Sequence, residues 1–457
     1  MLYPREVKTI SDAKKIVDAR GLSHVKVGFF DMDGNMLGKY MSKKKFFSSL
    51  DKGFDFCDVA LGWDCKNQLY DNTHFTGWHT GYPDAKMRII PESCRELPDE
   101  NGTLLFVCEF TKKAQSICPR SVLQRVIHFA TEQGFIVNAG FEYEFFMFQE
   151  TPESIREKGF KNLKTLSPDW CGYSVLRNST HSDLYHQILS LAEDMDFPIE
   201  SLHEEAGPGV IEAAISVDNA ESAADKAALF KTFMKVLAQK NELMATFMAR
   251  WSEDYPGQSG HIHISLNAIK NGHSEFFAPS HEHNMSNIQR HFIAGQQRLM
   301  PEFLVLLAPN INSYHRLTPG LWAPTHATWG VDNRTTAIRV IPGDENSQRI
   351  EYRLAAADSN PYLALAAALA SGLYGIMHKW QATKPVRGNA YDEKHQHEHP
   401  LPQTLGQATK MFKQSAAARE MFGDEFVDHF SATREWEERE FRKHISDWEL
   451  ERYFELI

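Results

Sequence analysis

The sequence predicts an α+β protein with a mainly antiparallel sheet, divided into a small N-terminal domain and a larger C-terminal domain. Three observations carry this prediction: a hairpin signal near the N-terminus, helical periodicity that becomes sustained only after Pro119, and later helices that alternate with short strand-like runs. A chain of 457 residues with 42% hydrophobic content can bury a large core, and its length alone suggests two or more domains.

The N-terminal part begins with a predicted hairpin. Two apolar runs flank Asp33-Gly34-Asn35, whose residue types tolerate the positive φ angles of a tight turn. Residues 64–91 are rich in Trp, Tyr, Gly, Asn and Asp without a sustained period, which predicts an ordered functional loop. Because the pattern then changes to a helix followed by strands, we place the domain boundary near residue 115, with domains at 1–115 and 116–457.

The larger domain contains most of the regular patterns. A helix is expected from Pro119 to Gly134, and residues 134–148 have the pattern of paired strands. Further strands are expected in GHIHISL and QRIEYRL, and further helices at 183–195, 222–243, 287–307 and in the charged tail 405–457. Residues 360–376 are nearly uncharged but short and rich in Ala, which predicts a buried helix rather than a membrane span.

Composition excludes several classes of function. The formal net charge of -11 argues against a nucleic-acid or anionic-membrane partner, because both reward a basic surface. The six cysteines form no C-x-x-C pair, so they are expected to be reduced thiols rather than zinc ligands or disulfides. The first residues, MLYPREVKTISDAKK, lack the apolar core of a signal peptide, and a cytoplasmic location is expected.

Acidic residues alternate with aromatic ones in FEYEFF. On a strand, Glu142 and Glu144 project from the same face while the aromatic residues fill the other face. Such a pair taken alone is more often a solvated strand face than a site. The same alternation recurs in GHIHIS, with His261 and His263, and in RIEYR, so three strands offer polar sets opposite apolar ones.

Between these strands, Glu205 and Glu212 flank a Gly-Pro-Gly segment that can bring both carboxylates back to one point. Together the segments supply five carboxylates and one imidazole: Glu142, Glu144, Glu205, Glu212, Glu351 and His261. This set is far richer in oxygen than a zinc site, so Mg²⁺ or Mn²⁺ is the expected ion.

Arginines gather in the same half of the chain. Guanidinium groups suit carboxylate and phosphoryl oxygens, although each arginine taken singly is more often a surface residue or a salt-bridge partner. Combined with the carboxylate strands, the set favours phosphoryl transfer. Its members are Arg316, Arg334, Arg339, Arg349 and Arg353.

Seven motifs in order, FEYEFF, HEEAGPGVIE, GQSGHIHISL, NSYHRLTPG, NRTTAIR, RIEYR and NPYLALAAALASGLYGI, resemble the glutamine synthetase superfamily over nearly the whole chain. The resemblance implies a small N-terminal β-grasp domain and a larger catalytic domain with a curved antiparallel sheet flanked by helices. It also implies ATP as co-substrate, two or more Mg²⁺ or Mn²⁺ ions per site, and a homo-oligomeric ring. A dodecamer of two stacked hexamers is expected, with each active site between neighbouring subunits.

The resemblance also implies metal ligands. The metal that orders glutamate would be held by Glu144, Glu205 and Glu212. The adjacent Glu204 is less favoured, because anchoring on Pro208-Gly209 puts Glu205 in register. The metal that serves the ATP phosphates would be held by Glu142, His261 and Glu351.

Further roles follow from the same resemblance. His263, Arg339 and Arg349 would contact the nucleotide phosphates, and Arg334 and Arg353 would stabilise the transferring phosphoryl group. Arg316 would hold the glutamate carboxylate, while the backbone of Gly257 would line the glutamate site.

The sequence departs from the family at the amine site. Where ammonia-using members carry a glutamate that helps to deprotonate ammonium, this chain has Trp322. An indole takes no proton from ammonium, but it offers apolar and cation-π contact to an organic amine; alternatively, Trp322 only packs the loop and a shifted acid substitutes. A family lysine is replaced by Asn346. The family's N-terminal-domain aspartate, given by a neighbouring subunit, aligns best with Asp64, with Asp58 and Asp71 also possible.

These features predict a γ-glutamyl-amine ligase, the branch of the family that joins glutamate to an organic amine. Trp322, with Trp63 and Phe56 near the candidate aspartate, favours a monoamine with an alkyl or aromatic group over a polyamine. The alternatives are an ordinary glutamine synthetase that uses ammonia and a non-catalytic family member. The last predicts lost ligands, whereas all six metal positions are filled.

Overall fold

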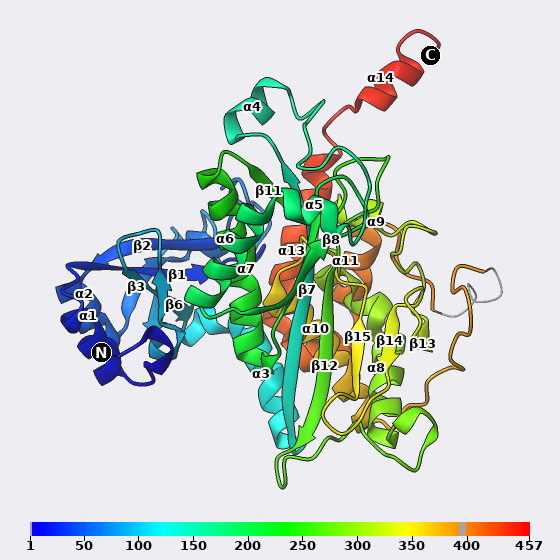
Figure 1. Ribbon diagram of the computed structural model, residues 1–457, viewed down its shortest axis with the longest axis horizontal. Helices are drawn as coiled ribbons and strands as arrows, with labels where there is room; N and C mark the ends of the chain where they lie inside the picture. Colours follow the sequence, from blue (N-terminus) through cyan, green and yellow to red (C-terminus); the bar gives the residue numbers. More distant parts are fainter. Residues whose placement is uncertain (1, 393–398) are drawn as a thin grey trace.

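The computed structural model describes residues 2–392 and 399–457. Two sheets organise these residues (Figure 1). The N-terminal sheet has the strand order β2-β1-β6-β4-β3, with β5 also paired to β6. The larger sheet has the order β13-β14-β15-β12-β7-β9-β8, with β10 and β11 also paired to β7. Both an α+β class and a mainly antiparallel large sheet are thereby confirmed.

The elements up to residue 115 form the N-terminal sheet and its helices. They are α1 (Ile10–Ala19), β1 (His24–Phe30), β2 (Met36–Ser42), α2 (Lys43–Lys52), β3 (Phe54–Cys57), β4 (Asp84–Ile89), β5 (Arg95–Leu97) and β6 (Thr103–Phe110).

The remaining elements form the large sheet and the helices around it. The strands are β7 (Phe135–Phe148), β8 (Ile199–Glu204), β9 (Val210–Ile215), β10 (Asp218–Asn219), β11 (Met244–Thr246), β12 (Gly260–Ala268), β13 (Trp329–Val331), β14 (Ile338–Ile341) and β15 (Arg349–Tyr352). The helices are α3 (Pro119–Glu132), α4 (Pro152–Glu157), α5 (Val175–Thr180), α6 (Ser182–Asp194), α7 (Ala220–Lys240), α8 (Asn287–Leu307), α9 (Ser313–Arg316), α10 (Pro361–Met377), α11 (Leu405–Gln414), α12 (Ala416–Phe422), α13 (Asp424–Phe441) and α14 (Asp447–Tyr453).

The predicted N-terminal hairpin is confirmed as β1 paired antiparallel with β2. Its turn is held by the Asp31 carboxylate, which accepts the backbone N–H groups of Asp33 at 3.0 Å and Asn35 at 2.8 Å. The prediction of an unbroken loop at 64–91 is wrong at its end, because β4 pairs with β3 and β6 there. This strand is short, so its period of two is lost beside the long aromatic loop before it.

Residues 135–148 form one long strand, β7, where the sequence suggested a pair. Nine consecutive residues of β12 pair with β7 in one register, from Gly260 opposite Tyr143 to Ala268 opposite Phe135. The pairing continues without a break through Gly140, which lies opposite His263. The two-residue alternation therefore continues along the strand and gives it one polar face and one apolar face.

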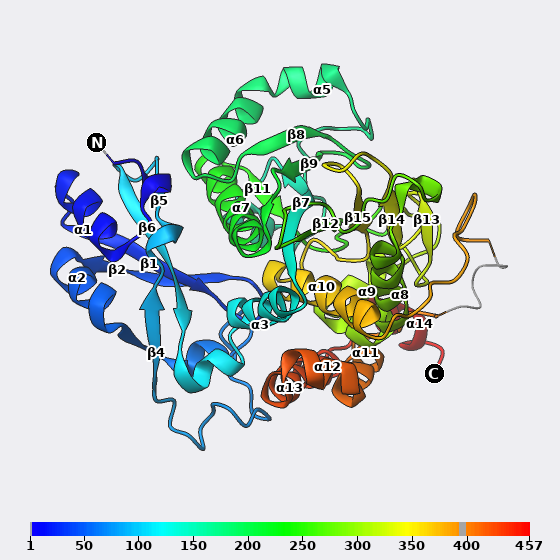
Figure 2. The same cartoon turned by 90° about the horizontal axis from the view of Figure 1, so that it is seen from below.

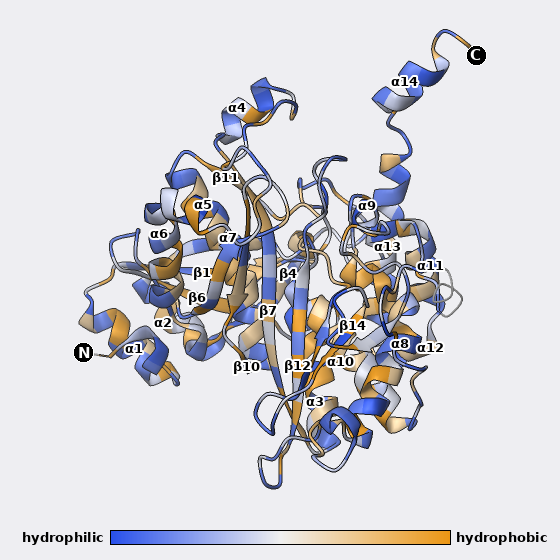
Figure 3. Ribbon diagram, turned by 45° about the vertical axis from the view of Figure 1, so that its right-hand side comes forward, coloured by the Kyte–Doolittle hydropathy of each residue, from blue (hydrophilic) through white to orange (hydrophobic). Residues whose placement is uncertain are grey.

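Helices cover the apolar face of β7 (Figure 2). The ring of Tyr143 stacks on Phe230 of α7, with centroids 6.2 Å apart, and Phe145 meets the same ring edge-on. Apolar residues, orange in Figure 3, gather between this sheet and the helices around α10. The opposite face of β7, which carries Glu142 and Glu144, is left for polar chemistry.

The buried helix predicted at 360–376 is confirmed as α10, which packs against α8 at a close backbone approach. A Cβ placed on Gly295 would lie 2.1 Å from the carbonyl oxygen of Ser371 and 2.6 Å from the amide nitrogen of Gly375. Only glycine fits this contact. Among the residues that the structure describes, no helix is long and apolar enough to cross a membrane.

The helical tail is confirmed as α11 to α14. Its last helix, α14, stands away from the body of the chain (Figure 1). Apolar side chains are exposed in α14 and on both sides of it: Ile445 before the helix, Trp448 within it and Phe454 after it.

Candidate active site

The polar face of β7 is the centre of the site. Glu142 lies opposite His261 on β12, and Glu144 lies opposite Glu212 on β9. On the far side of β12, His263 lies opposite Glu351 on β15. The register of four neighbouring strands therefore brings acids and histidines from four separate sequence motifs to one face.

The first cluster joins Glu142, His261, His263 and Glu351. The Nε2 atom of His263 is 3.0 Å from a Glu142 oxygen, and Nδ1 of His261 is 3.5 Å from the other. The same Nδ1 is 3.3 Å from Glu351. Side-chain atoms of Glu142, His263 and Glu351 also lie close enough together to hold one metal ion. Both histidines thus reach this group, although the resemblance had given His261 to the metal and His263 to phosphate.

Neighbouring bases keep these acids ionised. Burial opposes ionisation of Glu142, but hydrogen bonds from His261 and His263 hold its pKa well below its usual range. Burial likewise opposes ionisation of Glu351, yet the charges of His261 and Arg353 lower its pKa to about 2. Both side chains are therefore negatively charged at neutral pH.

Arginines border the cluster on the β14–β15 side. Arg339 donates to Glu351 at 3.0 Å and to Asp332 at 2.6 Å. Arg349 donates from Nε to Nδ1 of His263 at 3.2 Å. Arg353 is buried and pairs with Glu351. The structure thus places three of the predicted phosphate-binding arginines within one hydrogen bond of the cluster.

The fourth, Arg334, is exposed on the loop between β13 and β14. The hydrogen bond from Arg339 is the main cause of the lowered pKa of Asp332, and the charge of Arg334 adds to it. Burial raises the pKa of Tyr173 to about 12, and the charge of Arg334 only partly opposes that rise. Arg334 therefore lies beside the cluster without entering it.

The second cluster forms at the β8–β9 turn. Gly207 and Gly209 both have positive φ angles, 141° and 76°, which turn the chain back on itself. The turn brings side-chain atoms of Glu205 and Glu212 together with His203, close enough to hold one metal ion. Glu144 stands opposite Glu212 and accepts the backbone N–H of Ser259 at 2.6 Å.

Glu204 points elsewhere. It is only 2% exposed and accepts a hydrogen bond from the Ser167 hydroxyl at 3.2 Å. Neighbouring residues on a strand face opposite sides, so only one of Glu204 and Glu205 can enter the cluster. The geometry favours Glu205, in agreement with the register taken from Pro208-Gly209.

The acids of the second cluster repel one another. Burial, together with the charges of Glu144, Glu142, Glu205 and Glu351, raises the pKa of Glu212 to about 10. Several carboxylates on one face with too few positive partners are a donor set for hard divalent cations. The residues present therefore fit a divalent cation.

A small cavity of about 40 Å³ adjoins both clusters, and all three residues predicted to bind substrate line it. Arg316 lines it, buried, with its guanidinium donating to the carbonyls of Leu354 at 2.8 Å and Arg353 at 3.1 Å. Gly257 lies against Arg316: a Cβ there would be 2.7 Å from the arginine Cγ. Burial lowers the pKa of Arg316 to about 10, which still leaves it charged.

Trp322 also lines this cavity, at its exposed edge. Its side chain is 55% exposed, and its φ angle is 61°, which bulky residues rarely adopt. Backbone strain of this kind costs about 1–3 kcal/mol and concentrates at functional sites. This is the position that the family resemblance assigns to the glutamate of ammonia-using members.

The candidate aspartates of the N-terminal domain lie outside both clusters of the same chain. Asp64 accepts the backbone N–H groups of Lys66 and Gln68 and lines a different cavity. Asp58 is buried and accepts from Thr76, and Asp71 pairs with Arg439 at the surface. Within one chain, then, none of the three reaches the cavity that contains Trp322.

Two residues of the site escaped the sequence analysis. His203 precedes Glu205 by two positions, so the alternation used for Glu142 and Glu144 would have placed it on the same face. Tyr173 hydrogen-bonds Glu205 with its hydroxyl and packs its ring 4.8 Å from that of His203. It lies on a loop with a φ of 58°, where no periodic pattern exists to identify it.

The chain is similar to known proteins over most of its length. A family model described as glutamine synthetase, catalytic domain, matches residues 116–453. "Type-1 glutamine synthetase 2" of Dictyostelium discoideum is 44% identical over 95% of this chain and 84% of its own length. "Glutamate--isopropylamine ligase" of a Pseudomonas species is 33% identical over 98% of this chain and 99% of its own. A solved structure, "GmaS/ADP complex-Conformation 1", covers 97% of this chain and 99% of its own, with a TM-score of 0.84 at 22% identity.

Proposed function

Because this chain belongs to the glutamine synthetase family, we propose that it is an ATP-dependent ligase that joins the γ-carboxylate of glutamate to an organic amine. The observation that carries the proposal is the cavity in which Arg316, Gly257 and Trp322 adjoin the acidic clusters. This reaction needs an arginine to hold a carboxylate, and acids and arginines to neutralise charge on the phosphates. The indole at the entrance would contact the organic substituent of the amine.

Two groups of side chains would hold the divalent cations. One is Glu142, Glu351 and a histidine, with both His261 and His263 in reach. The other is Glu144, Glu205 and Glu212, to which the structure adds His203 as a neighbour. Bound Mg²⁺ or Mn²⁺ supplies charge neutralisation for the ATP phosphates and for the glutamate carboxylate.

The first chemical step is phosphorylation of glutamate. A γ-carboxylate oxygen attacks the terminal phosphorus of ATP, an oxygen–phosphorus bond forms, and ADP leaves. Arg316 would fix the glutamate carboxylate, while Arg339 and Arg349 would stabilise the phosphates and Arg353 the moving phosphoryl group, joined by Arg334 from the adjacent loop. The product, γ-glutamyl phosphate, has the leaving group that a free carboxylate lacks.

In the second step the amine nitrogen attacks the γ-carbonyl carbon, a carbon–nitrogen bond forms, and phosphate leaves. An alkylammonium ion has a pKa of about 10.4, so a base must first remove a proton at neutral pH. Asp64 of a neighbouring subunit is the candidate base, with Asp58 and Asp71 as the alternatives. Trp322 would cover the substituent and keep water from the acyl phosphate.

An ordinary glutamine synthetase is the second candidate function. It is favoured by one observation, the 44% identity to the Dictyostelium relative. The similarity to the isopropylamine ligase, which covers 98% of this chain and 99% of that protein, supports an organic amine as the substrate. Trp322 decides between them in our proposal, because an indole gives an alkyl or aromatic substituent an apolar contact and gives ammonia nothing.

We also propose the division into domains at 1–115 and 116–457 and a ring of subunits, most simply two stacked hexamers, in the cytoplasm. The ring is supported by the position of Asp64, which lies outside the site of its own chain.

The test is a product assay on the purified protein. ADP and a γ-glutamylamide should form only when glutamate, ATP, Mg²⁺ or Mn²⁺ and a nitrogen nucleophile are all present. Methylamine, ethylamine, isopropylamine, ethanolamine, aniline, putrescine and ammonia form a suitable panel. Full product yield without ATP would refute the ligase, and a preference for ammonia over every amine would support the second candidate function.

A further inference from the structure

The short helix α9 carries the arginine that would hold glutamate. It consists of four residues, and its two end residues, Ser313 and Arg316, are buried. Helices of this length are marginal by themselves, so contacts with the rest of the protein decide where they lie. The contacts of α9 therefore also decide where the guanidinium group of Arg316 meets the substrate cavity.

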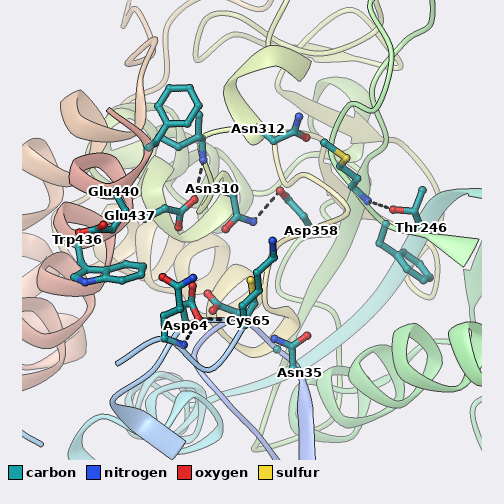
Figure 4. Close-up of a pocket in the computed structure, with 18 of the residues that line it drawn as sticks. Asn35, Asp64, Cys65, Thr246, Asn310, Asn312, Asp358, Trp436, Glu437 and Glu440 are labelled. Atoms are coloured by element: carbon teal, nitrogen blue, oxygen red, sulfur yellow. Dashed lines mark hydrogen bonds between the residues drawn. The ribbon is translucent and has the colours of Figure 1, made fainter. Parts of the chain in front are cut away.

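We propose that Asp358 is a positioning residue for glutamate, because its carboxylate fixes the first residue of α9 and thereby the place of Arg316. This inference rests on the proposed function, in which Arg316 holds the glutamate carboxylate. Asp358 follows the last residue of β15 by six positions and is partly buried. Its side chain lines a different cavity from the one that Arg316 lines, so it would act through α9 rather than by touching substrate (Figure 4).

Asp358 holds the start of α9 through one carboxylate oxygen. This oxygen, Oδ2, accepts the Ser313 hydroxyl at 2.7 Å and the side-chain amide of Asn310 at 3.0 Å. Figure 4 shows Asn310 and Asp358 facing each other, with the second bond as a dashed line. The Ser313 hydroxyl also accepts the backbone N–H of Asn310 at 3.1 Å, so its own proton is available for Asp358. The carboxylate thus joins α9 to the turn before it.

The other end of α9 is bonded to the same segment of the chain. The guanidinium group of Arg316 donates to the carbonyls of Leu354 at 2.8 Å and Arg353 at 3.1 Å. Residues 353–359 therefore hold both ends of the helix, the Ser313 end by a side chain and the Arg316 end by the backbone. Without the carboxylate of Asp358, only the Arg316 end would remain attached to this segment.

Residues 353–359 are themselves anchored to neighbouring elements. The backbone N–H of Ala357 donates to the carbonyl of Gln258 at 3.0 Å, next to Gly257 of the substrate cavity. The carbonyl of Ser359 accepts the buried ammonium group of Lys231 at 2.7 Å. Asp358 lies between these two attachments. It is therefore held by a fixed piece of backbone and can fix α9 in turn.

Arg250 also contacts α9. Its backbone N–H donates to the side chain of Asn312 at 2.9 Å, and its guanidinium group donates to the carbonyl of His315 at 3.1 Å. These bonds do not involve Asp358 and limit how far the helix can move. Loss of the Asp358 carboxylate should therefore displace Arg316 rather than release it, which predicts weakened glutamate binding rather than none.

Hydrogen bonding, more than charge, connects Asp358 with Arg316. Burial lowers the pKa of Arg316 to about 10, and the charge of Glu144 opposes this fall more than the charge of Asp358 does. Arg316 therefore stays protonated at neutral pH whether or not Asp358 is charged. An asparagine at position 358 keeps one oxygen that can accept from Ser313 and Asn310, whereas an alanine keeps none. The two substitutions separate hydrogen bonding from charge.

The experiment measures affinity without turnover, so that it is separate from the product assay. The full-length oligomer is titrated calorimetrically with L-glutamate in the presence of Mn²⁺ and ADP, and separately with ADP in Mn²⁺ alone. Asp358→Ala should weaken glutamate binding at least about 10-fold, the loss expected when hydrogen bonds to a charged group are broken. ADP binding should change by less than about 2-fold, because Arg339 and Arg349 lie on β14 and β15 rather than on α9.

Asp358→Asn is the rescue variant and Ser359→Ala the matched control. Asp358→Asn should bind glutamate within about 3-fold of the wild type, because both hydrogen bonds to α9 stay possible. Ser359 is the next residue, is buried, and donates its hydroxyl to the carbonyl of Ala356 at 2.8 Å within its own segment. Ser359→Ala removes a buried hydrogen bond beside Asp358 without altering the bonds to α9. It should bind glutamate as the wild type does.

Ser313→Ala provides a second, smaller change to the same contact. It should weaken glutamate binding by less than Asp358→Ala does, since the bond from Asn310 to Asp358 remains. Because the two residues act through one contact, the double variant should lose little more affinity than Asp358→Ala alone. Ser313→Ala also tests the proposal if Asp358→Ala fails to fold.

Four outcomes would overturn the proposal. Equal weakening of glutamate and ADP binding in Asp358→Ala would indicate a general structural role. A loss in Asp358→Asn as large as in Asp358→Ala would assign the effect to charge. Unchanged glutamate binding in Ser313→Ala, or fully additive losses in the double variant, would separate Asp358 from α9. Absence of saturable glutamate binding to the wild type would instead refute the proposed function, and this inference with it.

Discussion

Glu144 on β7 and Glu212 on β9 are direct cross-strand partners, so two carboxylates face each other across the centre of the sheet. Nearby like charges normally destabilise such a pair. Here burial and those charges raise the pKa of Glu212 to about 10. The protein therefore keeps an arrangement that is unfavourable without a counterion.

This pair gives a prediction about stability. A raised folded-state pKa means that the folded protein retains a proton that the unfolded chain releases above about pH 4.5, so stability falls as pH rises from about 4.5 toward 10. In EDTA, Glu212→Gln should raise Tm above pH 7 by about 2 °C or more. Mg²⁺ or Mn²⁺ should raise the Tm of the wild type more than that of the variant. Thermal scans from pH 6 to 9 check this, and superimposable metal-free curves would contradict it.

Glu204 and Glu205 form a matched pair of adjacent acids. Glu205→Gln should lower kcat more than about 100-fold, since it removes a proposed metal ligand and exceeds the loss usual for an outer-sphere partner. Glu204→Gln keeps the hydrogen bond from Ser167 possible and should retain activity within about 10-fold. Steady-state kinetics at saturating Mn²⁺, with oligomer size checked by light scattering, separates the two. Equal losses in both variants would reject the assigned register.

The position of Asp64 predicts a shared active site. Asp64→Ala and Glu144→Ala should each be inactive alone, because one lacks the neighbour's base and the other a metal ligand. When subunits are exchanged between them, some sites combine an intact N-terminal domain with an intact catalytic domain. Partial activity should then return. Proven exchange, shown by differently tagged chains in one particle, with no recovered activity would exclude a shared site.

Trp322 predicts amine specificity. The wild type should use an alkyl or aromatic amine with a higher kcat/KM than ammonia, and Trp322→Glu should narrow that preference by about 10- to 200-fold, the value of one apolar contact. Trp322→Phe, which keeps an aromatic ring at the same backbone position, should retain most of it. If the wild type prefers ammonia and Trp322→Glu does not change the order of kcat/KM values among the nucleophiles, the proposal of an organic amine substrate is wrong.

Much of the fold was predictable because long elements have strong periodic signals. Residues 287–307 and the hairpin around Gly34 were found from pattern alone. The sequence analysis did not find β4, and it divided β7 into two strands, for different reasons. The first is too short to show a period, and the continuity of the second is visible only from its nine-residue pairing with β12.

Part of the candidate site was likewise predictable from pattern, and part depends on the fold. A period of two identified the face on which Glu142 and His261 lie, but it cannot say which strand will pair with which. The contact of Glu351 with His261 depends on the order of strands in the sheet. Tyr173 comes from a loop with left-handed backbone, so only the folded chain shows that it reaches Glu205.

Because β7 is one continuous strand, it fixes the spacing between the two proposed ion sites. Successive same-face residues of an antiparallel strand are about 7 Å apart. Glu142 and Glu144 would serve different ions, so the distance between the nucleotide and the amino acid is set by one pleat of backbone, braced by β9 on one side and β12 on the other. Substitutions at positions such as Trp322 can then adapt the enzyme to another nucleophile, while the spacing between Glu142 and Glu144 stays the same.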